Sequence, residues 1–226
     1  MATPLDLQEQ EQLDDLKAFW KNWGNLITWV LVAMLGAYAA WNGWNYYQRD
    51  QAQKAGAMYD ELDRAVQGGD ADKATRIFGD LKERFPGTAF AEQGGLAAAR
   101  VQFDKGQLDA AKASLTWVAQ SAAQEALRDV ARLRLAGLLL DAKQYDAALV
   151  QLEAAKGAEF STLAADRRGD VLAAMGKMAE AKSAYEAAFK GMGERLEYRR
   201  LVDAKLTALG ASPAAAVALP AAGASK

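Results

Sequence analysis

The longest apolar stretch of the chain lies near its N-terminus, where Asn22 to Gln48 carries no charged side chain. A helix needs about 20 mostly apolar residues to cross a hydrocarbon core about 30 Å thick, and this stretch is long enough. Aromatic side chains, which settle at the headgroup level of a bilayer, lie at both ends: Trp20, Trp23 and Trp29, then Trp41, Trp44, Tyr46 and Tyr47. We therefore predict a single transmembrane anchor over residues 22–48, in contact with the lipid bilayer.

Two other interpretations of this stretch are a buried helix of a soluble domain and a cleaved signal peptide. The run Ala37 to Ala39 has the small residues of a cleavage site. A signal peptide, however, opens with a short, positively charged region. Residues 1–21 form a longer segment in which acidic residues outnumber the lysines. We therefore expect a short acidic tail over residues 1–21, followed by an anchor that is retained.

The pattern after the anchor is helical as far as Leu209. Pro86 is the only proline between positions 5 and 212, and no window alternates apolar and polar residues over the length of a strand. Alanine, the residue with the highest helix propensity, recurs throughout. The sequence predicts an all-α protein.

Internal repetition indicates the architecture of this helical part. Four similar segments each contain a small alanine, and these alanines are 37, 37 and 33 residues apart. Each alanine is followed four residues later by a large side chain, which gives the pairs Ala74 and Phe78, Ala111 and Leu115, Ala148 and Leu152, and Ala181 and Tyr185. The pattern resembles the tetratricopeptide repeat, a helix–turn–helix unit of about 34 residues. Ala136 and Gly169 stand where that repeat has a small residue in its first helix, and Ala55–Gln67 matches the first helix least well.

Repeats of this kind stack because each helix pair buries only part of its apolar surface. We therefore predict a tetratricopeptide-like α-solenoid over residues 49–210, with about four helix–turn–helix repeats and a capping helix. The capping helix is expected over Leu196 to Leu209, with Gly210 ending it. Residues 211–226 are rich in alanine and proline, which predicts a disordered tail.

Composition argues against chemistry. The chain has no cysteine and no histidine. It therefore lacks a nucleophilic thiol, and it also lacks the commonest general base and the commonest metal ligand. The charged cluster from Asp166 to Asp170 has no paired group that would make it an acid–base site. The net charge of −2 comes without a basic stripe, which argues against nucleic acid as a partner. We expect no enzyme activity, no cofactor and no metal site.

Binding surface is what remains, and two sets of residues are candidates. The first helices of such repeats line the concave face, although the same positions can be ordinary surface and core. The candidate groove residues are Gln93, Arg100, Phe103, Leu133, Gly137, Asp141, Asp166 and Asp170. Small residues aligned along a membrane helix permit close approach of another helix, although they are also common in membrane spans. The candidate residues for that contact are Ala33, Gly36, Ala40 and Gly43.

The complete layout resembles the YfgM family, ancillary subunits of the bacterial Sec translocon. The shared local features are Leu16 to Trp20 before the anchor, Trp41 to Tyr47 at its end, Phe85 to Ala91, Leu133 to Ala136, and Ala165 to Asp170. The resemblance implies a single-pass inner-membrane protein with a cytoplasmic N-terminus and a periplasmic repeat domain. It also implies three partners: the Sec channel subunits, a membrane-anchored periplasmic chaperone of the prolyl-isomerase-like type, and unfolded client chains.

Charge alone does not decide the orientation of the anchor. Lys17 and Lys21 precede the anchor, whereas Arg49, Lys54 and Arg64 follow it, so the positive-inside rule favours neither side clearly. The alternative function is therefore a cytoplasm-facing, membrane-tethered repeat scaffold for another protein complex.

Overall fold

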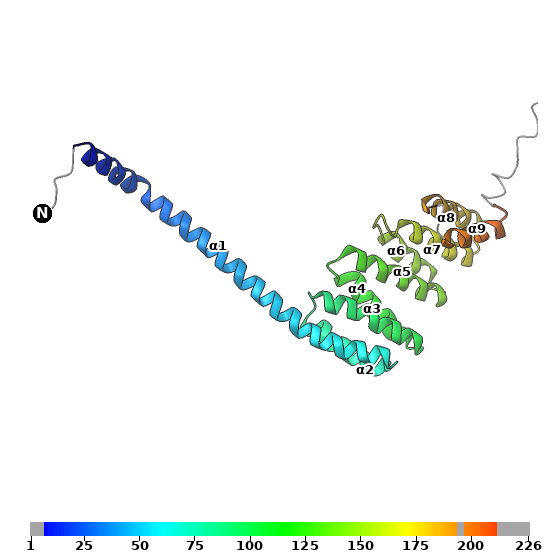
Figure 1. Ribbon diagram of the computed structural model, residues 1–226. Coiled ribbons are helices and arrows are strands. Elements are labelled where there is room, and N and C mark those ends of the chain that lie inside the picture. The colour runs from blue at the N-terminus through cyan, green and yellow to red at the C-terminus, as the bar shows by residue number, and fades with distance from the viewer. Residues whose placement is uncertain (1–6, 194–196, 212–226) are drawn as a thin grey trace, which may run out of the picture. The chain divides into compact units, whose positions relative to one another are not determined.

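The computed structural model describes residues 7–193 and 197–211, and its regular elements there are all α-helices (Figure 1). The predicted all-α class is confirmed. The helices are α1 (Leu7–Gln67), α2 (Ala71–Arg84), α3 (Ala89–Asp104), α4 (Leu108–Ser121), α5 (Glu125–Asp141), α6 (Tyr145–Ala154), α7 (Ser161–Ala174), α8 (Met178–Gly191) and α9 (Glu197–Ala208). Parts of three predictions lie outside the described residues: residues 1–6 of the acidic tail, Leu196 of the capping helix, and residues 212–226 of the C-terminal tail.

The chain divides into two compact units, Met1–Gln51 and Ala52–Lys226. Helix α1 supplies residues to both units, because no proline interrupts it between Leu7 and Gln67. The helix therefore begins inside the segment that the sequence marks as a tail, and it continues past residue 48. Its last part forms the first helix of the repeat domain, at the place where the sequence predicts one.

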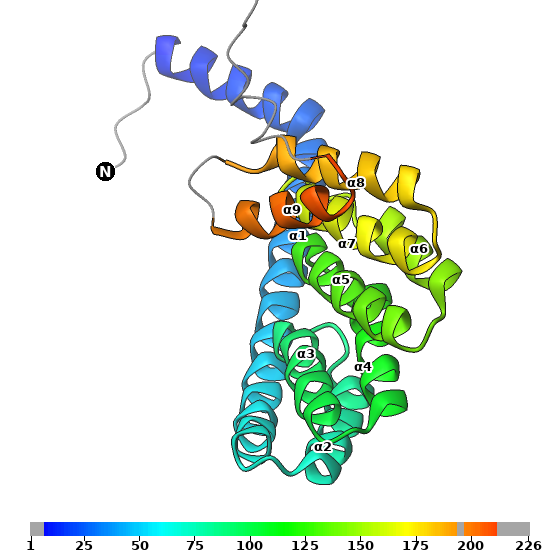
Figure 2. The same ribbon diagram turned by 90° about the vertical axis from the view of Figure 1, so that its right-hand side faces the viewer.

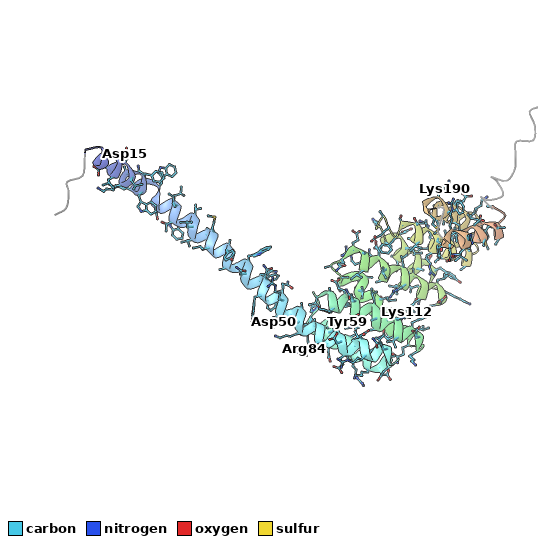
Figure 3. The ribbon with its side chains drawn as sticks, viewed as in Figure 1. Asp15, Asp50, Tyr59, Arg84, Lys112 and Lys190 are labelled. Atoms are coloured by element: carbon cyan, nitrogen blue, oxygen red, sulfur yellow. The ribbon has the colours of Figure 1, made fainter. Side chains whose placement is uncertain are left out.

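The first unit contains the apolar segment as a bare helix. Only 6% of its most apolar window is buried by the rest of the chain, and the mean hydropathy is 1.4. Figure 3 shows side chains projecting freely on all sides of α1 before Asp50. A helix from the core of a soluble protein would be mostly buried, so this exposure agrees with a segment whose solvent is lipid. Among the residues that the structure describes, α1 is the one helix long and apolar enough to cross a membrane.

The second unit is a stack of helix pairs. The C-terminal part of α1 shares one apolar core with α2, and α3 then pairs with α4, α5 with α6, and α7 with α8, while α9 packs on the last pair. Figure 2 shows the first helices α3, α5 and α7 following one another along the stack. The four alanines predicted to sit between paired helices are all fully buried: Ala74, Ala111, Ala148 and Ala181. The predicted tetratricopeptide-like architecture is therefore confirmed.

Small residues let paired helices approach each other closely. A Cβ atom on Gly169 of α7 would lie 2.4 Å from the ring of Tyr185 in α8, so only glycine fits there. In the same way, a Cβ atom on Gly95 of α3 would lie 2.4 Å from Val118 in α4. The repeat pattern assigns Gly169 to the small-residue position of a first helix, and the ring of Tyr185 facing it explains why a small residue is needed there.

The turn between the helices of each pair has the same backbone geometry in all four repeats. At its C′ position the backbone takes a positive φ angle: 67° at Gly69, 74° at Gly106, 58° at Lys143 and 78° at Gly176. The next residue donates its N–H to a carbonyl five residues earlier, as in the 2.9 Å bond from Asp70 to Ala65. This is the Schellman motif, in which glycine is favoured because it has no Cβ atom to clash. Lys143 is the exception to glycine at this position.

In two of the helix pairs, a buried acidic side chain on the first helix accepts a hydrogen bond from the linker that follows the second helix. Glu92 of α3 accepts the backbone N–H of Ala123 at 2.7 Å, and Asp129 of α5 accepts that of Gly157 at 2.7 Å. Asp129 also accepts from Arg132, and its side chain is fully buried. Each of these contacts satisfies a linker N–H that would otherwise lack a partner. We call them the linker ties.

Candidate binding groove

Four of the eight predicted groove residues surround one hollow between α3 and α5. They are Arg100 and Phe103 of α3, and Gly137 and Asp141 of α5. The hollow has a volume of about 390 Å³. Arg134 lies at its edge, and its remaining lining consists of the apolar residues Ala99, Leu115 and Leu138. We call this site the α3–α5 hollow.

The α3–α5 hollow combines an apolar floor with a charged rim. Ala99, Leu115 and Leu138 are all buried, whereas the Phe103 side chain is 46% exposed. Within residues 7–193 and 197–211, Arg100, Arg134 and Asp141 form no ion pair or hydrogen bond with another side chain. Such a surface can bind a partly apolar ligand and orient it by charge.

Gly137 lies in the wall of the hollow without a packing reason to be glycine. No atom lies within 4 Å of the position that a Cβ atom would occupy there. Its backbone is helical, so no unusual φ angle requires glycine either. The absence of a side chain at this position leaves space open to solvent.

Two further predicted residues lie outside the hollow. Gln93 is exposed near the start of α3, and Leu133 is half-buried against the core formed by α4, α5 and α6. The structure therefore brings only part of the predicted set together. A role for these two residues in binding a chain stays a prediction.

Asp166 and Asp170, the last two predicted groove residues, bind the capping helix α9. Asp166 is fully buried, and its carboxylate accepts from the Tyr198 hydroxyl at 2.6 Å and from the Lys205 ammonium at 2.8 Å. Asp170 accepts from the same ammonium at 2.7 Å and from the Tyr185 hydroxyl at 2.8 Å. We call this arrangement the cap network. Because both carboxylates are used within the fold, their part in binding a chain stays a prediction.

The cap network also affects both tyrosines. Burial, followed by the hydrogen bond to the Asp166 carboxylate, raises the pKa of Tyr198 to about 12. Burial and the hydrogen bond to Asp170 raise the pKa of Tyr185 well above its usual value. Both hydroxyls therefore stay protonated as donors over the whole neutral range.

The sequence did not identify two residues that matter in the structure, Arg134 and Gln102. Arg134 precedes Gly137 by about one helical turn and completes the rim of the hollow. Gln102 is buried between two repeats, where it donates to Thr75 and accepts from Ser114, each at 2.8 Å. One signal could have identified Gln102 as an interior residue: it precedes Ala111 by the same number of positions as Leu139 precedes Ala148.

The predicted contact residues of the membrane helix have no packing partner among the described residues. Ala33, Gly36, Ala40 and Gly43 are all exposed, and nothing lies within 4 Å of a Cβ atom built on either glycine. Contact with another membrane helix stays a prediction. Across the part of the chain that the structure describes, no group of three or more acidic, histidine or cysteine side chains could hold a metal ion.

Comparison with known proteins gives one consistent result. A family model described as a tetratricopeptide repeat-like domain matches residues 17–211. A protein of Neisseria gonorrhoeae is 31% identical over 207 residues, which cover 90% of this chain and 98% of that protein. A protein of Escherichia coli is 32% identical over 80% of this chain and 87% of its own length. A protein of Haemophilus influenzae is 29% identical over 84% and 93%. Each of the three is named an ancillary SecYEG translocon subunit.

Proposed function

Since the chain belongs to the tetratricopeptide repeat-like family of ancillary SecYEG translocon subunits, we propose that it is a non-catalytic, membrane-anchored protein-binding subunit that works beside the Sec channel. The single observation that carries the proposal is the length of the match. It includes both the membrane helix and the repeat domain, and it covers nearly the whole of the Neisseria relative. A shared repeat alone would support only a shared fold.

The repeat domain is the part that would handle other proteins. In our proposal it lies in the periplasm, where it holds emerging secreted and membrane proteins or passes them to a membrane-anchored chaperone of the prolyl-isomerase-like type. Stacked helical repeats present extended concave surfaces suited to such chains. The α3–α5 hollow supports this role, because it is an uncovered surface that mixes apolar and charged side chains.

The proposal depends first on the side of the membrane that the repeat domain occupies. The chain has no cysteine, so a single thiol can report its own exposure. Ser161 is suitable because it is exposed at the first turn of α7. We expect Ser161→Cys in intact spheroplasts to react with a membrane-impermeant maleimide before lysis. Asp15→Cys, at an exposed position ahead of the anchor, is the matched control and should react only after lysis.

Labelling of Ser161→Cys only after lysis would contradict a periplasmic repeat domain. It would support the cytoplasm-facing scaffold instead, a function that the lysine and arginine residues on both sides of the anchor leave open.

Association with the channel is tested separately. We expect channel subunits to co-isolate with the full-length chain in a mild detergent that keeps the channel intact. Replacing Gly36 and Ala40 by leucine should weaken this recovery if the small-residue face of the anchor makes the contact. Leu31→Ala, at an exposed position on the opposite face of the same helix, is the control and should leave this recovery unchanged. Absence of channel subunits from the wild-type sample would contradict the proposal.

A further inference from the structure

We propose that the α3–α5 hollow selects what the domain binds: it seats one large apolar side chain of an extended segment that carries acidic residues beside it. This inference rests on the proposed function, because it assumes that the domain binds chains, and it adds the chemistry of the segment. Three features of the hollow support it: a glycine with free space beside it, an apolar wall of limited size, and two arginines that have no ion pair among the described residues.

The first feature is the glycine in the middle of α5. Glycine inside a helix costs about 0.5–1 kcal/mol relative to alanine, and what the missing side chain makes possible differs from one position to the next. Gly95 and Gly169 allow close helix packing, since a Cβ atom on either would collide with the facing helix at 2.4 Å. At Gly137 a Cβ atom would meet nothing within 4 Å. The fold does not use the space beside Gly137, and a side chain from a ligand can.

The second feature is the apolar wall around that space. Leu115 and Leu138 form its buried floor, and Phe103 stands beside them with nearly half of its side chain exposed. The volume of about 390 Å³ is near the lower end of the range for ligand sites, which is about 300–1,000 Å³. A hollow of this size suits one large side chain with its adjoining backbone rather than a folded surface. Burying that side chain next to Phe103 supplies the apolar part of the affinity.

The third feature is the charge of the rim. The guanidinium groups of Arg100 and Arg134 come from different helices, and neither has an ion pair among the described residues. Guanidinium groups are matched by carboxylates, which accept two parallel hydrogen bonds from them. Asp141 is about 10 Å further along α5 than Arg134, given a rise of 1.5 Å per residue. It can accept a backbone N–H of the segment, which would fix the direction in which the segment lies.

The test uses short fluorescein-labelled peptides and the full-length chain in detergent micelles, with binding followed by fluorescence anisotropy. One peptide carries a phenylalanine between two aspartates, the second carries lysines in place of the aspartates, and the third carries alanine in place of the phenylalanine. We expect the first to bind about threefold to fivefold more tightly than the second, which is the upper part of what one exposed ion pair supplies. We expect the third to bind about tenfold more weakly than the first, because its apolar anchor is missing.

Variants of the chain locate the site. Gly137→Leu fills the hollow and should weaken binding of the first peptide at least about tenfold. This loss is comparable to replacing the phenylalanine of the peptide by alanine. Gly79→Leu is the matched control: Gly79 also lies inside a helix, α2, with nothing within 4 Å of a Cβ atom, but away from the hollow. Arg134→Gln should remove most of the preference for aspartate over lysine, whereas Arg76→Gln on α2 should leave it unchanged. Circular dichroism confirms that each variant is folded, and Gly137→Ala provides a milder filling.

The outcomes separate this inference from the proposed function. Equal binding of the aspartate and lysine peptides, no binding at all, or equal losses from Gly137→Leu and Gly79→Leu would overturn the inference. None of these results would affect co-isolation of the channel, which tests the proposed function. Conversely, a repeat domain found on the cytoplasmic side would end the proposed function, while selective binding of the first peptide would still support the chemistry of the hollow.

Discussion

The cap network makes a quantitative prediction about how α9 is held. Asp166→Ala removes the buried acceptor of the Tyr198 hydroxyl and one of the two carboxylates around Lys205. Breaking a buried ion pair costs about 3–5 kcal/mol, because the remaining charge is left without a partner. Here Asp170 still holds the ammonium at 2.7 Å, so we expect the lower end, about 3 kcal/mol. For a chain of this size that corresponds to a fall in Tm of about 6–12 °C.

The assay is thermal unfolding of the full-length chain in detergent, followed by far-ultraviolet circular dichroism. A second readout uses the cysteine-free background: Leu206→Cys, whose parent side chain is fully buried on α9, reports opening of the cap by its rate of reaction with a maleimide. We expect Asp166→Ala to accelerate this reaction. Arg200→Ala, an exposed site on the same helix, is the control and should change stability by no more than about 0.5 kcal/mol.

A Tm for Asp166→Ala within 1 °C of the parent chain, with an unchanged rate of labelling, would refute the reasoning. It would mean that apolar contacts alone hold the cap. Those contacts are present, since Val202 and Leu206 of α9 are fully buried in the same core as Tyr185. Lys205→Met supplies an independent comparison, because it leaves Asp166 buried without its cation and should destabilise the fold at least as much.

Three further predictions concern single positions. Lys143→Gly should raise the free energy of unfolding by about 0.5–1 kcal/mol in urea titrations. A left-handed backbone costs a lysine about 1–2 kcal/mol, and part of this gain is offset because glycine loses more backbone entropy on folding. An unchanged or lower stability would contradict the prediction. Gly169→Ala should lower stability by about 1–3 kcal/mol, since the new Cβ atom meets the Tyr185 ring at 2.4 Å, and a neutral result would mean that the ring moves aside easily. The raised pKa of Tyr198 makes the folded state bind its proton more tightly than the unfolded state, so this contribution to stability is complete below pH 10 and is lost as the pH rises towards 12. Tyr198→Phe should reduce this alkaline dependence in pH-resolved melts, and an identical slope would show that other groups cause it.

The repeat architecture could be predicted because its signal is local and recurs. The four anchoring alanines occupy equal places in successive segments, and in the structure each is completely buried. Such a pattern survives changes in neighbouring residues, since a close helix crossing tolerates only a small side chain. The membrane helix was predictable for a similar reason, because a bilayer requires a long apolar run whatever the order of its residues.

The cap network and the linker ties could not be predicted, because they join residues distant in the sequence by side chains that look like ordinary surface charges. Lys205 binds a carboxylate 39 positions earlier, and Asp129 binds a backbone N–H 28 positions later. No spacing rule links such partners. Asp166 therefore looked like a groove residue on its helix, and only the folded chain shows that α9 covers it. Four of the predicted groove residues line the hollow, while Arg134, which also lines it, was missed; that this surface binds a chain stays a prediction.

The linker ties have a consequence for how the domain comes apart under load. Each repeat of a solenoid touches only its neighbours, so such a domain can in principle unravel helix by helix. Glu92 and Asp129, however, each fasten the entrance of a helix pair to its own exit, 31 and 28 residues further on. Pulling one helix out of such a pair strains the bond that closes the pair. When the chain is drawn from its C-terminal end, the pairs α5–α6 and α3–α4 should therefore each come apart as one unit, and force spectroscopy would record an extension step of one helix pair for each.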